Sequence, residues 1–166
     1  MKKLFNFGNI LFYLVIFLFI FIPLYPKFPL FNITGTFVAI RIEDLLIGLT
    51  ISLWGIYLVV SNQLRSFLKD KLTQAILLFF FVGMVSTFSA VFLTHTVVSH
   101  ISILHLLRRI EFMMLLPVVV SVVRTKRQLI GILVILFMVV LSVNLYALGQ
   151  QYLDWPVIAT TNSEFS

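Results

Sequence analysis

The chain has 166 residues, of which 61% are hydrophobic and only 11% charged, with a mean hydropathy of +1.12 and a net charge of +6. A soluble domain carries about 25% charged residues, so this composition excludes a water-exposed globular surface and predicts an integral membrane protein. The basic residues form short groups between apolar runs, which favours membrane orientation over nucleic-acid binding. The absence of cysteine excludes disulfides and thiol-based metal or redox sites.

A spanning helix needs about 20 apolar residues, and five segments qualify: 8–25, 43–61, 73–93, 105–123 and 128–149. The first follows a basic start but has no small-residue cleavage site, so it is interpreted as an uncleaved anchor. The predicted fold class is all-α, a polytopic transmembrane helix bundle of about five helices. Residues 1–166 form a single transmembrane region, expected to be the N-terminal part of a longer membrane protein.

The segment 105–123 is the one whose crossing is least certain from its residues. Only the twelve residues 112–123 are uncharged, and they rise only about 18 Å. To span, the helix must carry Arg108, Arg109 and Glu111 in its outer turns, and Pro117 is expected to bend it. The alternative is a four-helix protein in which this segment lies at the interface.

The loops predict an orientation. With the N-terminus in the cytoplasm, 8 of the 12 basic residues lie inside, at residues 2–3, 65–71 and 124–127. Such a bias favours that orientation, with the C-terminal tail outside after five crossings.

Two further expectations concern packing. The helix at 8–25 is almost wholly Phe, Leu, Ile and Val, so it is expected to face lipid. Small residues recur at i, i+4 and i+7 in the next two helices, which allows close helix contact or reflects common residue usage in membranes; they are Gly48, Ser52 and Gly55, then Gly83, Thr87 and Ala90.

An Arg-Ile-Glu motif occurs twice in front of an apolar run, at 41–43 and 109–111. Both motifs belong to helices predicted to descend from the outer face, so they are expected at the same depth. One alternative is that these residues anchor helix ends at the membrane interface. Arginines in a partly desolvated outer cavity instead suit a phosphate or pyrophosphate; the candidates are Arg41, Arg108 and Arg109.

Helical spacing predicts the partners of these charges. The i, i+3 pairs Arg41–Asp44 and Arg108–Glu111 are expected to meet on one helix face. Glu43 and Arg109 lie i, i+2 from the other charges of their motifs, about 200° away around the helix. Glu43 and Arg109 are therefore expected to pair across the bundle.

The sequence contains few other candidates for a metal-binding or catalytic site. His95, His100 and His105 recur every five residues, about 140° apart on a helix, and so share no metal-binding face. No Gly-rich phosphate loop or nucleophile elbow is present. No catalytic residue, metal or cofactor is predicted.

The segment Tyr25-Pro26-Lys27-Phe28-Pro29, with Gly35-Thr36 and Arg41-Ile-Glu-Asp44 after it, resembles the first outer loop and second helix of the O-antigen ligase family. This family includes O-antigen polymerase-like proteins. The sequence Arg109-Ile-Glu-Phe112 and the tail "TTNSEFS" are similar to the family as well.

The resemblance implies a multi-pass protein of the bacterial plasma (inner) membrane in cell-surface polysaccharide assembly. Such enzymes transfer glycan from an undecaprenyl-pyrophosphate carrier to lipid A-core, in lipopolysaccharide synthesis, or to another glycan. The family's catalytic Arg and His residues lie in a late outer loop that this sequence lacks, so the chain alone is expected to be inactive. Arg41, Arg108 and Arg109 are therefore proposed only as supporting residues.

The alternative function is a non-enzymatic one: a small membrane subunit, or a fragment of a transporter or flippase. A reading frame that continues past Ser166 into further helices and a long outer loop favours the ligase-like interpretation, and one that stops there favours the small subunit.

Reporter fusions test the predicted topology. Because the basic residues favour the cytoplasm, fusions within residues 62–72 and 124–127 are expected to give cytoplasmic signals. Fusions within 26–40 and 150–166 are expected to report from outside. A cytoplasmic signal from a fusion after Gln151 would contradict the five-crossing topology and favour four.

Overall fold

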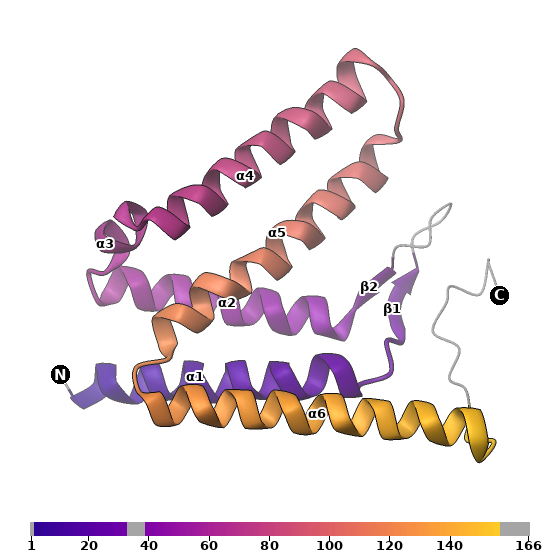
Figure 1. Ribbon diagram of the computed structural model, residues 1–166. Helices are drawn as coiled ribbons and strands as arrows, with labels where there is room; N and C mark the ends of the chain where they lie inside the picture. Colours follow the sequence, from indigo (N-terminus) through magenta and orange to yellow (C-terminus); the bar gives the residue numbers. More distant parts are fainter. Residues whose placement is uncertain (1, 33–38, 157–166) are drawn as a thin grey trace.

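The computed structural model describes residues 2–32 and 39–156. These residues form a helical bundle with one small antiparallel hairpin (Figure 1). The five long helices are α1 (Lys2–Leu24), α2 (Ile42–Val60), α4 (Lys71–Phe88), α5 (Ser99–Val122) and α6 (Lys126–Tyr152). A short helix α3 (Leu64–Lys69) precedes α4, and a π-helix η1 (Ser89–Leu93) extends it. The predicted all-α class is confirmed.

Successive long helices run in alternating directions, so the loops after α2 and after α5 lie at the same end as the start of α1 (Figure 1). We call this the α3 end. The hairpin of β1 (Pro29–Asn32) and β2 (Ala39–Arg41) lies at the other end, called here the hairpin end. The predicted orientation puts the basic loops at residues 65–71 and 124–127 on the same side, and the structure places both at the α3 end.

Four helical segments are long and apolar enough to cross a membrane: Phe7–Leu24, Ile42–Val60, Lys71–Leu93 and Lys126–Tyr152. The chain is thus a multi-pass membrane protein by length and composition. Helix α5 is as long as these, and it stays helical through Pro117, but its three charges set it apart. It runs between the two ends of the bundle beside α2 (Figure 1), and whether it crosses the membrane stays a prediction.

The core lies where α1, α2 and α5 meet. Its members are almost fully shielded from solvent: Leu11, Val15, Trp54, Tyr57, Leu58, Val118 and Val122. The indole Nε1 of Trp54 donates to the Ser121 hydroxyl at 2.6 Å, which satisfies the one polar atom of that buried ring. The Arg124 guanidinium donates to the Tyr57 hydroxyl and closes the α3 end of this core.

The expectation that the first helix faces lipid holds for one of its faces and is wrong for the other. Helix α1 packs against α2, α5 and α6, and Leu11 is fully buried while Tyr13 is 68% exposed. Hydropathy does not separate the two faces, because lipid tails are as apolar as leucine side chains. Which residues face protein is decided by packing, which an all-apolar helix does not reveal in its sequence.

The small-residue faces behave differently from each other. A Cβ added to Gly83 would lie 3.3 Å from Leu106 Cδ1, so this glycine permits the close approach of α4 to α5. Among the described residues, and apart from the surrounding backbone of α2 itself, no atom lies within 4 Å of a Cβ added to Gly48 or Gly55. The predicted close contact is therefore confirmed for α4 and is not made at these two glycines of α2.

Replacing Leu11 by alanine tests the core. Large-to-small changes at buried leucines cost about 2–5 kcal/mol in soluble proteins. In a membrane the cost of lost packing remains, while transfer from water matters less. We therefore expect Leu11→Ala to lower the free energy of unfolding by about 2 kcal/mol.

Unfolding of the purified protein in detergent measures this change. Leu133→Ala is the matched control, because Leu133 is 56% exposed on α6. Equal losses for the two variants would contradict the assigned core.

Candidate functional site

The candidate site is the charged cluster at the hairpin end, built around the start of α2. Arg41 is the last residue of β2 and caps α2 with an extended backbone, at φ −119° and ψ 163°. Its backbone N–H donates to Asp44 Oδ2 at 3.0 Å. An acidic residue at the third helical position commonly accepts from the capping residue in this way, so Asp44 fixes how the hairpin enters the helix.

Arg108 joins this helix start to α5. Its Nη2 donates to Asp44 Oδ2 at 2.8 Å and to the backbone carbonyl of Ala39 at 2.7 Å. The Arg108 and Asp44 side chains are 27% and 15% exposed, so the ion pair is largely shielded from solvent. One guanidinium therefore holds together β2, α2 and α5.

Glu43 is the most buried charge of the cluster, at 2% exposure. Its Oε1 accepts from Arg41 Nη1 at 3.4 Å, whereas its Oε2 has no hydrogen-bond partner within the described residues. Glu111 of α5 lies close enough to Asp44, Arg108 and Glu43 to interact with each electrostatically. Three carboxylates and two guanidinium groups thus share one partly buried site.

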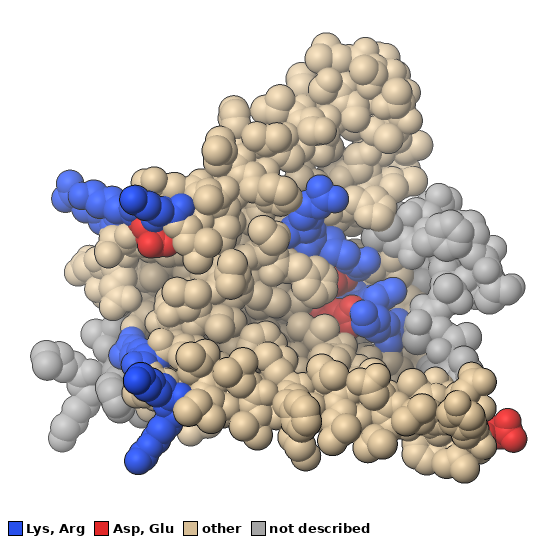
Figure 2. Space-filling model, viewed as in Figure 1, with Lys and Arg blue, Asp and Glu red and all other residues tan. Residues whose placement is uncertain are grey.

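Figure 2 shows this cluster as blue and red atoms in the middle of one face, separated by uncharged surface from two basic groups at the α3 end. Long charge-free stretches flank it in sequence, at residues 45–64 and 112–123. Ionised groups are costly within a bilayer and persist where they pair with one another, and the cluster does so here.

The predicted pairing is wrong in its partners. Glu43 pairs with Arg41 and not with Arg109, because Arg41 is extended and the helical separation of about 200° does not apply to it. Arg108 pairs with Asp44 across the bundle and makes no ion pair with Glu111 within the described residues. The two motifs do lie at the same depth, as expected, but Asp44 and Arg108 make the contact.

Arg109 points to a different place. It lies about 100° further around α5 than Arg108 and lines a cavity of about 400 Å³ between α4 and α5. No ion pair or hydrogen bond engages its guanidinium within the described residues. His105, one turn earlier, lines the same cavity with three hydroxyl residues, Ser86, Thr87 and Ser102, whereas its remaining lining residues are apolar.

The predicted arginines therefore divide into two kinds. Arg41 and Arg108 are engaged in the cluster, and Arg109 alone of the three faces a cavity with its donors free. The sequence missed His105 as a neighbour of Arg109, although their i, i+4 spacing was a usable signal. Within the described ranges no three His, Asp or Glu side chains are placed to hold a metal ion.

The hairpin was also missed. Its strands pair Pro29 with Arg41 and Asn32 with Ala39, with an irregularity between Pro29 and Phe31. β-Branched residues on both sides of Gly35 were a signal for it. The motif Gly35-Thr36 and the tail "TTNSEFS" lie outside the described residues.

Comparison of the chain with protein-family models, curated proteins and solved structures gives no match. The class of the protein therefore follows from its own features: a multi-pass helical membrane protein with a partly buried charged cluster near one end. The finer assignment is a proposal and is argued below.

A double-mutant cycle tests the link between α2 and α5. Asp44→Asn and Arg108→Gln each remove one partner of a hydrogen bond to a charged group, worth about 1.5–3 kcal/mol. Partial exposure reduces that value, so we expect a coupling of about 1–2 kcal/mol in the unfolding free energy measured in detergent.

The matched control cycle combines Asp44→Asn with Arg109→Gln. Arg109 is adjacent in sequence but makes no contact with Asp44, so these two losses are expected to add within about 0.5 kcal/mol. Additivity in the Arg108 cycle, or coupling in the Arg109 cycle, would contradict the geometry described above.

Proposed function

We propose that this chain is the N-terminal membrane portion of an O-antigen ligase-like protein of the bacterial inner membrane. In this proposal it helps to hold an undecaprenyl-pyrophosphate-linked glycan, which is transferred to lipid A-core or to another glycan. The support from sequence is the resemblance at residues 25–29, 41–44 and 109–112. The support from geometry is the cavity beside Arg109.

Arg109 is the observation that carries the proposal. A guanidinium presents a planar fork of donors that fits phosphate oxygens two at a time. Arg41 and Arg108 each donate to a carboxylate of the cluster, and Arg108 also donates to a carbonyl. Arg109 makes no ion pair or hydrogen bond within the described residues and lines the cavity beside His105. A pyrophosphate at this point would meet one permanent positive charge and one imidazole.

The remaining cavity walls suit the lipid part of such a carrier. Phe79, Val82 and Leu106 line the cavity from α4 and α5, and Val82 is 57% exposed on the outer surface of the bundle. An isoprenoid chain would therefore pass from lipid into the cavity without crossing a polar surface. Sites of this kind combine apolar walls with a few placed polar groups.

The neighbouring charged cluster would act indirectly. Arg108 and Arg109 are consecutive, so the bonds from Arg108 to Asp44 and Ala39 fix the rotation of α5 that turns Arg109 towards the cavity. The glycosyl transfer itself is expected to need the family's late outer loop, and no residue of this chain is assigned a catalytic role. What this chain supplies in the proposal is carrier binding and orientation.

Binding of a photoreactive polyprenyl pyrophosphate in nanodiscs tests this function. Loss of a charge-assisted hydrogen bond worth about 1.5–3 kcal/mol weakens binding by roughly tenfold or more. We therefore expect Arg109→Gln to raise the apparent Kd at least tenfold, with crosslinks in wild type mapping to α4 and α5.

The matched control is Arg65→Gln, which removes an exposed arginine at the α3 end and is expected to leave binding unchanged. A photoreactive polyprenyl alcohol with the same isoprenoid chain but no pyrophosphate should crosslink equally to wild type and to the Arg109→Gln variant. Unchanged pyrophosphate binding in Arg109→Gln would overturn the proposal.

A further inference from the structure

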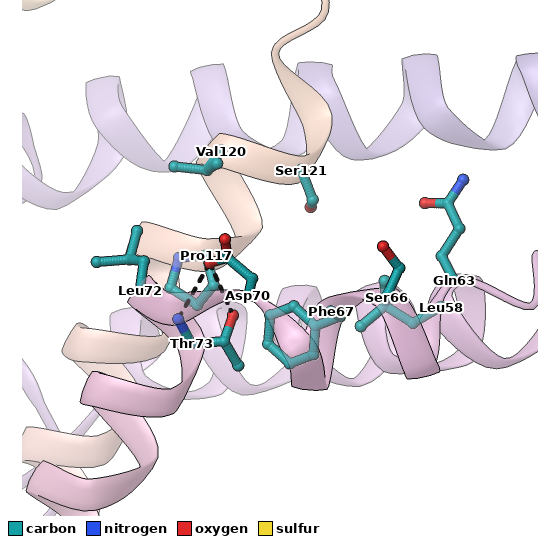
Figure 3. A pocket seen from close by; sticks show the side chains of 10 residues that line it. All are labelled: Leu58, Gln63, Ser66, Phe67, Asp70, Leu72, Thr73, Pro117, Val120 and Ser121. Atoms are coloured by element: carbon teal, nitrogen blue, oxygen red, sulfur yellow. Dashed lines mark hydrogen bonds between the residues drawn. The ribbon is translucent and has the colours of Figure 1, made fainter.

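A second cavity, of about 230 Å³, lies at the α3 end of the bundle. Figure 3 shows it between α3 and the start of α4 on one side and the last turns of α5 on the other. Its apolar lining consists of Leu58, Phe67, Leu72, Pro117 and Val120. The Phe67 ring is fixed there by an edge contact with Trp54, with centroids 4.9 Å apart.

The cavity has an apolar mouth. Leu72 of α4 is 42% exposed and Val120 of α5 is 58% exposed, so both line the cavity and also reach the outer surface of the bundle. Helix α4 belongs to a segment apolar enough to span a membrane. The mouth therefore meets lipid acyl chains as well as the interface.

The polar lining divides into engaged and free groups. Ser121 accepts from Trp54 at 2.6 Å and donates to the Val118 carbonyl at 2.8 Å. Asp70 caps α4 by accepting from the Thr73 N–H at 3.1 Å. The Gln63 amide and the Ser66 hydroxyl are exposed and make no side-chain hydrogen bond within the described residues. Figure 3 shows both extending towards the space beside Ser121.

Basic residues lie next to this space in sequence, although none of them is among the residues that line it. Residues on the α3 side supply Arg65, Lys69 and Lys71, and residues 124–127, which follow Ser121 closely, supply three more basic side chains. Figure 2 shows these as two basic groups at one end of the molecule. Asp70 is the single acidic side chain that lines the cavity, and its carboxylate is directed to the N-terminus of α4.

We propose that this cavity binds one anionic phospholipid of the leaflet at the α3 end. The phosphate lies at Gln63 and Ser66, within the field of the two basic groups, and one acyl chain enters between Leu72 and Val120 onto Phe67. Basic groups beside a spanning helix attract anionic headgroups in general. The free amide and hydroxyl and the apolar mouth are what make this a single defined site.

The inference is independent of the proposed function, because this cavity shares no lining residue with the cavity beside Arg109. The predicted orientation makes this the cytoplasmic leaflet, but the binding itself needs only the geometry of the α3 end.

Native mass spectrometry of the purified protein in detergent tests the site. Phosphatidylglycerol and phosphatidylcholine with identical acyl chains serve as the two probes. Wild type is expected to retain one phosphatidylglycerol with a several-fold preference over phosphatidylcholine. Equal retention of the two lipids would overturn the inference.

Two variants separate the cavity from the surface charge. Ser66→Phe fills the cavity and should reduce retained phosphatidylglycerol at least fivefold, whereas Leu68→Phe, on the same helix outside the cavity, should retain it. Val120→Trp blocks the exposed mouth and should repeat the loss even if Ser66→Phe destabilises α3. Full retention of the lipid in Val120→Trp would overturn the proposal.

A charge variant and a soluble competitor complete the test. Lys69→Gln with Arg127→Gln should lower the preference for phosphatidylglycerol to near one, while Lys27→Gln, at the hairpin end, should leave it unchanged. Glycerol 3-phosphate at millimolar concentration should not displace the lipid. Displacement by this headgroup alone would show that the acyl chain contributes nothing and would overturn the inference.

Discussion

The guanidinium of Arg108 is the point on which the hairpin end depends. It reaches from α5 to the Asp44 carboxylate and to the Ala39 carbonyl, at 2.8 and 2.7 Å. The same Asp44 oxygen also accepts the backbone N–H of Arg41. Removing Arg108 would therefore remove its link between α5, α2 and β2 and leave the partly buried Asp44 carboxylate with the Arg41 N–H as its remaining partner within the described residues.

This arrangement also explains why ionised groups are tolerated in so apolar a chain. The desolvation cost of a charge falls when its partners lie within hydrogen-bond distance, and Arg41 and Arg108 each supply such a partner to a carboxylate. Three carboxylates and two guanidinium groups lie in the cluster, and the Oε2 of Glu43 has no hydrogen-bond partner within the described residues. Arg109 lies on the adjacent face of α5 and lines the cavity.

The sequence predicted the helices well because charge-free runs of about 20 residues leave few alternatives to a spanning helix. It also predicted that residues 41–44 and 108–111 meet at one depth. It failed at the partners, because helical spacing was applied to Arg41, whose backbone is extended. It failed at α1 as well, since a helix apolar on all sides does not mark the face occupied by Leu11. The small-residue pattern predicted the close approach of α4 to α5 at Gly83, but it did not predict the cavity beside Arg109, which depends on how the two helices are placed in space.

The position of α6 has a consequence for the order in which the bundle assembles. Its main neighbour is α1, so the last helix of the described chain docks against the first. The core of α1, α2 and α5 contains no residue of α6, so it can form while α6 is still being synthesised. Until then the second face of α1 is covered only by lipid. Contacts between distant parts of a chain form late because loop closure precedes them. The contact between α1 and α6 is therefore expected to form after the core of α1, α2 and α5.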